Sequence, residues 1–131
     1  MDRHPHFRIV EALSILQQRF TEPALRLSDV AGHARLSPTH LARLIKATTG
    51  ITFLQHLRRL RVGRAEQLLL TTMLSIKEIA AQSGYSTSGS LTRDFHRVHA
   101  CTPTAWRARR RSAQELLARD TNCEAIARTV C

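Results

Sequence analysis

Apolar residues recur every three to four positions along the chain, which is the spacing of helices that bury one face. Near the N-terminus this pattern runs through Ile9, Leu13, Leu16 and Phe20. The pattern predicts seven helices, over about residues 9–20, 28–34, 37–48, 53–70, 75–83, 87–98 and 102–111. No segment alternates apolar and polar residues as a half-buried strand would. The predicted fold class is therefore all-α.

Residues typical of helix ends stand between these segments. Small polar residues that cap helix N-termini precede four of them, two followed by proline: Ser37-Pro38, Thr52, Ser75 and Thr102-Pro103. Ser75 and Glu78 have the S-x-x-E spacing of a capping box. Gly50 and Gly84 follow predicted helices, where a left-handed residue commonly ends the helix. These signals predict short connections between the helices.

The chain also contains an internal repeat. At an offset of 49, Val30-Ala31 aligns with Ile79-Ala80 and Leu36-Ser37 with Tyr85-Ser86. With one extra residue the offset becomes 50, and the following residues align in pairs: Leu41 with Leu91, Arg43 with Arg93, Ile45 with Phe95, Gly50 with Ala100 and Thr52 with Thr102. Each copy holds a short helix, a tight turn and a second helix, which is the layout of a helix-turn-helix unit.

Each copy has the residue types that such a unit needs. Ala31 and Ala80 are small enough to lie where the two helices cross closely. Gly84 suits a turn that requires positive φ, whereas Arg35 at this place in the first copy predicts mild strain or a slightly different turn. Apolar residues are expected on the inner faces: Leu27, Val30, Ala34, Leu36, Leu41 and Leu44, then Ile76, Ile79, Tyr85, Leu91 and Phe95.

The charge of the chain points to an acidic partner. Its 131 residues fit one domain, or two very small domains with a shared core, and include 20 Lys and Arg against 10 Asp and Glu, a net charge of +10. Nucleic acid or an anionic membrane surface would suit this excess. No apolar run approaches the roughly 18 residues of a membrane span, and no signal peptide is expected. The three cysteines are expected to be reduced thiols in a cytoplasm, so the predicted location is cytoplasmic. With a nucleic-acid partner, the chain would be associated with the nucleoid.

Two such units in one chain predict a reader of two DNA sites. The helix predicted over residues 53–70 would span about 27 Å, at 1.5 Å a residue. Such a strut would set two recognition helices about one DNA turn, near 34 Å, apart. Both would enter successive major grooves on one face of the duplex. We therefore expect a monomer on double-stranded DNA, at a site that need not be a palindrome.

Several segments resemble the AraC/XylS family of transcription regulators. They are Leu36-Ser-Pro-Thr-His-Leu-Ala-Arg-Leu-Ile-Lys46, Leu57-Arg-Arg-Leu-Arg-Val-Gly-Arg-Ala65, Ser75-Ile-Lys-Glu-Ile-Ala-Ala-Gln-Ser-Gly-Tyr-Ser86, Leu91-Thr-Arg-Asp-Phe95 and Thr102-Pro-Thr-Ala-Trp-Arg107. The resemblance covers about residues 8–110 and is greatest to the stand-alone MarA/SoxS-like members, which lack an effector domain. It implies seven helices, two helix-turn-helix units and binding to promoter DNA, usually with activation through RNA polymerase.

The resemblance also implies which side chains meet DNA. The first recognition helix would present Thr39, Ala42 and Arg43 to bases, and the second Ser88, Gly89, Thr92 and Arg93. Residues expected at phosphates lie at the helix starts or a turn further along: Ser37, His40, Lys46, Ser86, His96 and Arg97. The chain departs from the family pattern at several positions: Arg26 at an expected cap, His99 and Ala100 for an aromatic and a glycine, and the short Ala42 and Gly89.

Several of the basic residues have two interpretations each. Arg43 or Arg93 would read guanine, or instead pair with a carboxylate or phosphate. The basic stripe of Arg58, Arg59, Arg61 and Arg64 would be a solvated face or a contact surface, with Arg61 a candidate for internal pairing. The basic run at 107–111 would grip phosphate or form an ordinary basic helix end.

No catalytic constellation is visible, so we expect no enzyme activity, no cofactor and no metal. His4 and His6 form an HxH without a third ligand, Cys101 is expected to be a passive thiol, and Phe95 and Trp106 are expected in the core. The expected division is 8–52 and 71–111 for the two helix-turn-helix subdomains, 53–70 for the linker helix, and 112–131 for a tail of unknown role. This tail, with Leu116, Leu117, Ile126 and Val130, is a candidate for a further helix.

Two alternatives to a stand-alone regulator remain open from the sequence. The chain would be the DNA-binding piece of a longer, effector-responsive regulator, or a helical module of the same fold that binds protein as an adaptor or anti-activator. The short residues Ala42 and Gly89 leave the second alternative open.

Overall fold

The structure is a computed structural model that describes the backbone of residues 5–130 and the side chains of residues 7–119. Over this range it contains seven helices and no strand: α1 (Pro5–Arg19), α2 (Leu27–His33), α3 (Pro38–Thr49), α4 (Phe53–Thr71), α5 (Ile76–Gln82), α6 (Ser88–His99) and α7 (Pro103–Val130). The predicted all-α class and the order of the helices are confirmed. The last helix extends further than the sequence predicts.

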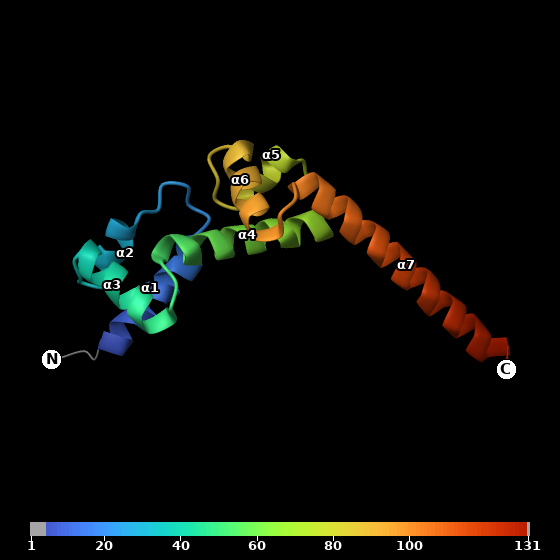
Figure 1. Cartoon of the computed structure of the whole chain (residues 1–131), viewed down its shortest axis with the longest axis horizontal. Helices are drawn as coiled ribbons and strands as arrows, with labels where there is room; N and C mark the ends of the chain where they lie inside the picture. The colour runs from blue at the N-terminus through green and yellow to red at the C-terminus, as the bar shows by residue number, and fades with distance from the viewer. Residues whose placement is uncertain (1–4, 131) are drawn as a thin grey trace.

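The helices form two groups at the two ends of α4 (Figure 1). Helices α1, α2 and α3 gather at its start, while α5, α6 and the beginning of α7 pack along its later turns. Each group has a hydrophobic core of its own, to which α4 contributes: Phe53 and Leu57 in the first, and Val62, Ala65, Leu68 and Leu69 in the second. Because α4 contributes to both cores, it links the two subdomains. Its 19 residues span about 28 Å.

The two turns have the same backbone geometry, which confirms the repeat. Leu36 donates its N–H to the carbonyl of Ala31 at 2.9 Å, and Tyr85 donates to Ala80 at 2.9 Å. Arg35 (φ 57°) and Gly84 (φ 97°) both adopt the left-handed conformation, so the first copy keeps the turn with a strained residue. The helices that follow are capped by Ser37 and by Thr87, which identifies Ser86 as the extra residue of the second copy.

Most of the predicted helix ends are confirmed. Ser37, Thr52 and Thr102 each accept a hydrogen bond from the backbone N–H three residues on, and Gly50 (φ 83°) ends α3. The prediction of a capping box at Ser75 is wrong for one of its two hydrogen bonds. Ser75 Oγ accepts from the N–H of Glu78 at 3.2 Å, but the exposed Glu78 carboxylate forms no return bond.

A complete capping box forms at Thr52, because Gln55 Oε1 also accepts from the Thr52 N–H at 2.8 Å. At the start of α2, Asp29 Oδ2 accepts from the N–H of Arg26 at 2.9 Å. Arg26 therefore begins a helix without a short polar side chain, since the carboxylate of the third helical residue satisfies its amide.

At the end of α6, Ala100 and His99 replace the glycine and the aromatic residue of the family pattern, and the structure accommodates both. Ala100 takes the left-handed cap conformation (φ 58°), and its N–H donates to the carbonyl of His96 at 2.8 Å. The ring of His99 packs on Phe95 at 4.5 Å between centroids and on Trp106 at 5.4 Å, and its Nε2 lies 2.5 Å from Glu66 Oε1. A histidine thus occupies an aromatic position by stacking on two core rings and pairing with a residue of α4.

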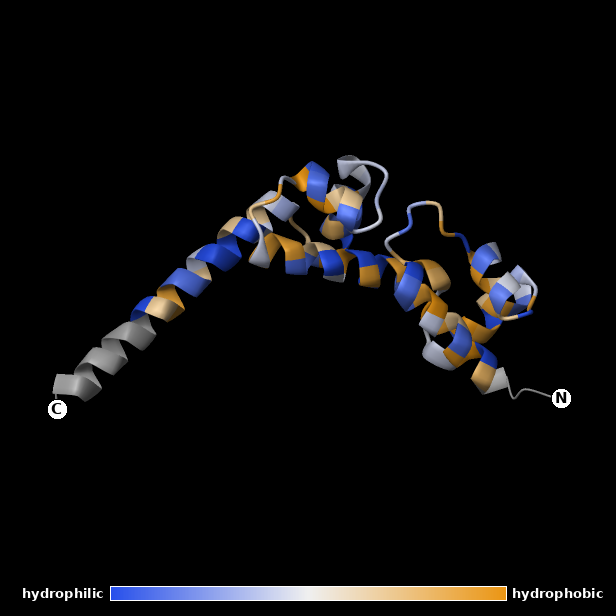
Figure 2. Ribbon diagram, turned by 180° about the vertical axis from the view of Figure 1, so that it is seen from behind, coloured by the Kyte–Doolittle hydropathy of each residue, from blue (hydrophilic) through white to orange (hydrophobic). Residues whose placement is uncertain are grey.

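Phe95 and Trp106 are core residues, as predicted, and meet edge to face at 5.5 Å. Helix α7 continues unbroken past the predicted end at residue 111 and leads away from the rest of the molecule (Figure 2). Residues 112–119 are all exposed, Leu116 and Leu117 included. The side chains of Cys123, Ile126, Val130 and Cys131 lie outside the described residues. None of the described helices has a stretch long and apolar enough to cross a bilayer.

Candidate nucleic-acid interface

Helices α3 and α6 present matching faces to solvent. Counted from the helix start, the fourth and eighth residues point into the cores: Leu41 and Ile45 in α3, Leu91 and Phe95 in α6. Since successive helical residues turn by about 100°, the second, sixth and ninth residues lie on the opposite side, and the fifth lies at its edge. Arg43 and Arg93 are both the sixth residue and both exposed. Neither guanidinium has a hydrogen bond or ion pair among the described residues.

The other residues predicted at bases lie on or beside these faces. Thr39, Ser88 and Gly89 are exposed, whereas Ala42 and Thr92 are partly buried. Thr92 Oγ1 donates back to the carbonyl of Ser88 at 2.9 Å, which occupies its hydroxyl proton and leaves its lone pairs for another donor. The two sets correspond by position, because Thr39, Ala42 and Arg43 match Gly89, Thr92 and Arg93.

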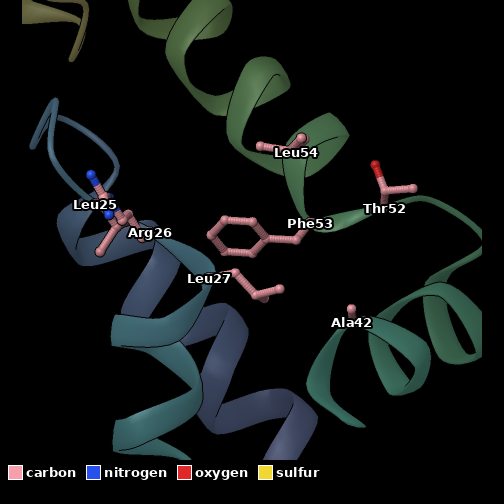
Figure 3. A pocket seen from close by; sticks show the side chains of 7 residues that line it. All are labelled: Leu25, Arg26, Leu27, Ala42, Thr52, Phe53 and Leu54. Atoms are coloured by element: carbon pink, nitrogen blue, oxygen red, sulfur yellow. The ribbon is translucent and has the colours of Figure 1, made fainter. Parts of the chain in front are cut away.

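Ala42 also borders a pocket that the sequence does not reveal (Figure 3). This apolar pocket has a volume of about 420 Å³ and is lined by Leu25, Arg26, Leu27, Ala42, Thr52, Phe53 and Leu54. Figure 3 shows the ring of Phe53 pointing from the start of α4 toward α2. The methyl group of Ala42 therefore faces the space between α3 and α4 as much as the solvent.

The residues predicted at phosphates are all exposed: Ser37, His40, Lys46, Ser86, His96 and Arg97. Two of them also have structural roles. Ser37 Oγ accepts from the N–H of His40 at 3.1 Å, and Lys46 Nζ donates to the carbonyl of Gly50 at 2.9 Å. The remaining protons of the Lys46 ammonium are free for an anion, since this group has three donors.

Neither of these two helices presents an acidic side chain on its exposed face, where a carboxylate would repel a phosphate. Helix α3 contains no Asp or Glu, and the single acid of α6, Asp94, is turned inward. Its Oδ2 accepts from Tyr85 Oη at 3.0 Å, and its Oδ1 lies 3.5 Å from Arg58 Nε. Burial raises the pKa of Tyr85, and the negative charge of Asp94 raises it further, so the phenol stays a neutral donor. No pattern in the sequence predicts this pair, whose residues are nine positions apart.

Several arginines of the basic stripe and of the basic run have internal partners. Arg61 bonds to backbone carbonyls, which supports its internal pairing, while Arg64 bonds to Gln67 and Arg59 is exposed. Arg107 Nε donates to the carbonyl of Leu69 at 3.1 Å, and Arg111 donates to that of Thr72 at 3.3 Å.

These two arginines therefore cap the C-terminus of α4. Arg110 lies over the ring of Trp106 at 5.2 Å, and Arg109 is exposed. Among the described residues no three His, Cys, Asp or Glu side chains lie close enough to hold a metal ion. His4 and the side chain of His6 lie outside the described residues.

Comparisons of the chain with known proteins all indicate the same family. The family described as "Helix-turn-helix domain" matches residues 30–109. The chain is 36% identical over 83 residues to the HTH-type transcriptional activator RhaR of Mannheimia succiniciproducens, covering 63% of this chain. It spans only 30% of the length of that relative.

Two solved structures share the fold. The DNA-binding domain of AdpA, a global transcriptional factor solved in complex with a target DNA, has a TM-score of 0.77 and 27% identity, over 82% of this chain and 96% of that one. A transcriptional regulator of Chromobacterium violaceum, described among proteins that contain an AraC-type DNA-binding domain, has a TM-score of 0.71 and 30% identity, over 80% and 93%. The chain therefore belongs to the AraC/XylS family of helix-turn-helix transcription regulators.

Proposed function

We propose that this chain binds double-stranded DNA sequence-specifically as a monomer and regulates transcription, with α3 and α6 in adjacent major grooves. The observation that carries the proposal is the pair of exposed arginines at one helical position in two repeated units. An Arg side chain can donate two hydrogen bonds to O6 and N7 of one guanine. The solved AdpA domain with its target DNA supports the same use of this fold.

We assign residues 8–52 and 71–111 as the two DNA-binding units and 53–70 as the link between them. Arg43 and Arg93 read guanines, while Thr39, Ser88 and Thr92 supply hydroxyl groups to bases. Ala42 offers a methyl group for contact with thymine, and Gly89 lets the backbone approach closely. The residues at phosphates are Ser37, His40, Lys46, Ser86, His96 and Arg97.

The helix N-termini contribute to the same interface. The N–H groups of Thr39 in α3 and of Ser88 and Gly89 in α6 lie in the first turns, where a helix offers them no partner, and the positive ends of the helix dipoles favour phosphate oxygens. Activation through RNA polymerase, at the nucleoid, is the mode of regulation that we infer from the family and from the activator RhaR.

Titration of a fluorescent random-sequence duplex of about 30 base pairs with the chain tests this proposal. At 50 mM salt we expect binding, because a +10 chain neutralises several phosphates. Six or more phosphate contacts would reduce the affinity roughly 10³-fold or more between 50 and 200 mM salt. A chain that does not bind the duplex at 50 mM salt is not a DNA-binding regulator, and a protein partner would then explain the fold.

A further inference from the structure

Within the described residues, the two subdomains also contact one another beside α4. Their hydrophobic cores are separate and share only α4, so a further contact beside this helix adds a restraint on how α3 and α6 are oriented about its axis. The second contact lies beside the middle of α4, where the segment after α1 approaches the turn between α5 and α6 (Figure 1). We call this contact the junction, and it consists of Arg61, Gly84, Tyr85, Asp94 and the backbone of residues 20–22.

Arg61 is at the centre of the junction. Its Nε donates to the carbonyl of Phe20 at 2.8 Å, and a terminal nitrogen donates to the carbonyl of Glu22 at 2.8 Å. Its guanidinium also lies over the ring of Tyr85, 5.7 Å from the centroid. One side chain of the linker helix therefore contacts both subdomains, with hydrogen bonds to residues about 40 positions away and a cation–π contact to the second turn.

Gly84 lets the two backbones approach closely. A Cβ atom at this residue would lie 2.4 Å from the carbonyl oxygen of Phe20, 2.8 Å from Arg61 Nε and 3.0 Å from the Cα of Thr21. No real side chain tolerates contacts this short, and the φ of 97° already favours glycine. The turn of the second unit is thus packed directly on the end of the first.

Tyr85 and Asp94 connect this contact to the second recognition helix. Tyr85 is 6% exposed, and its hydroxyl donates to Asp94 in α6 at 3.0 Å. Asp94 is also paired with Arg58, one helical turn before Arg61 on α4, at 3.5 Å. Arg61 is therefore connected to α6 through Tyr85, which lies under its guanidinium and is bonded to Asp94. Arg93, the proposed guanine reader, is the residue next to Asp94.

We propose that the junction fixes the angle and separation of α3 and α6, and so determines the spacing between the two DNA half-sites that the chain accepts. This proposal rests on the proposed function. Arg61 is then a positioning residue that acts through Tyr85, Asp94 and the end of α1. Each added base pair moves a half-site by about 3.4 Å and rotates it by about 35°, so a rigid reader accepts one spacing. A reader without the junction accepts neighbouring spacings more readily.

The experiment compares Arg61→Gln with Arg59→Gln, which removes the same charge from an exposed position of the same helix. The probes are a duplex with the best two-block site selected by the unaltered chain, the same duplex with one base pair inserted between the blocks, and a duplex with one block scrambled. Circular dichroism and thermal melting show whether each variant is folded. Tyr85→Phe, which keeps the ring and removes the hydroxyl bond to Asp94, is a second variant.

We expect the inserted base pair to weaken binding of the unaltered chain at least 30-fold. For Arg61→Gln we expect about tenfold weaker binding to the best site, binding to the one-block duplex within twofold of the unaltered chain, and a spacing penalty below fivefold. Tyr85→Phe should shift the penalty in the same direction, and it decides the test if Arg61→Gln does not fold. Arg59→Gln should reduce binding to all three probes by one common factor.

Equal losses on all probes with an unchanged spacing penalty, for Arg61→Gln and for Tyr85→Phe, would overturn the role of the junction and leave the proposed function standing. A failure of the unaltered chain to select any sequence would instead overturn the proposed function, and the spacing proposal with it.

Discussion

Arg43 and Arg93 are the residues on which the proposed DNA recognition depends most. Their alignment in the repeat, their exposure and their helical position were all open to prediction from the sequence, because a 3.6-residue period fixes which positions face away from the core. The inward turn of Asp94 was not. It depends on Tyr85 and Arg58, whose proximity is a property of the packed subdomain.

Replacing either arginine by alanine should weaken binding to the selected site by about 1–3 kcal/mol, since one bidentate contact to guanine is lost. Binding to random duplex should change by less than threefold. Arg97→Ala is the control, because loss of a phosphate contact weakens both kinds of binding and reduces the salt slope by about 1. Equal losses on specific and random DNA for Arg43→Ala and Arg93→Ala would contradict their assignment to bases.

Ala100 is a second residue whose conformation has a measurable consequence. It ends α6 with a φ of 58°, where a Cβ atom costs roughly 1–2 kcal/mol. Glycine relieves this strain but increases the entropy of the unfolded chain, so Ala100→Gly should stabilise the protein by about 0.5–1 kcal/mol in urea unfolding. Ala108→Gly, in the interior of α7, should instead destabilise it by about 1 kcal/mol. A lower stability of Ala100→Gly would show that the cap is not strained.

The helices themselves follow closely from local signals. Ser37, Thr52 and Thr102 cap helices where predicted, because a capping bond joins residues only three positions apart. The ends that depend on distant residues could not be foreseen. At the end of α4, the carbonyls of Leu69 and of the cap residue Thr72 accept from Arg107 and Arg111, 38 and 39 residues further on, which the sequence shows only as part of a basic run.

This cap predicts a stability difference between neighbouring arginines. Arg107→Ala leaves the carbonyl of Leu69 without its charged donor and should destabilise the protein by roughly 1–2 kcal/mol in urea unfolding. Arg109→Ala removes the same charge from an exposed position and should change the stability by less than about 0.5 kcal/mol. If the two variants lose the same stability, the cap does not contribute to folding.

At the scale of the whole molecule, the duplication explains both the fold and the proposed function. In the proposed function, two copies of one helix-turn-helix unit at the ends of α4 would let a single chain bind as dimeric readers do with two subunits. The repeat and the length of α4 were predictable. The junction was not, since Arg61, Gly84 and the backbone of residues 20–22 meet only when both subdomains are formed.

Selection of bound sequences from a random duplex pool tests the central claim, that both units read DNA at once. We expect an asymmetric consensus of two blocks, with centres about 10–10.5 base pairs apart and a guanine in each. Selection with Arg43→Ala should lose the guanine of one block, and selection with Arg93→Ala that of the other. A single block, a palindrome or no enrichment would contradict the account.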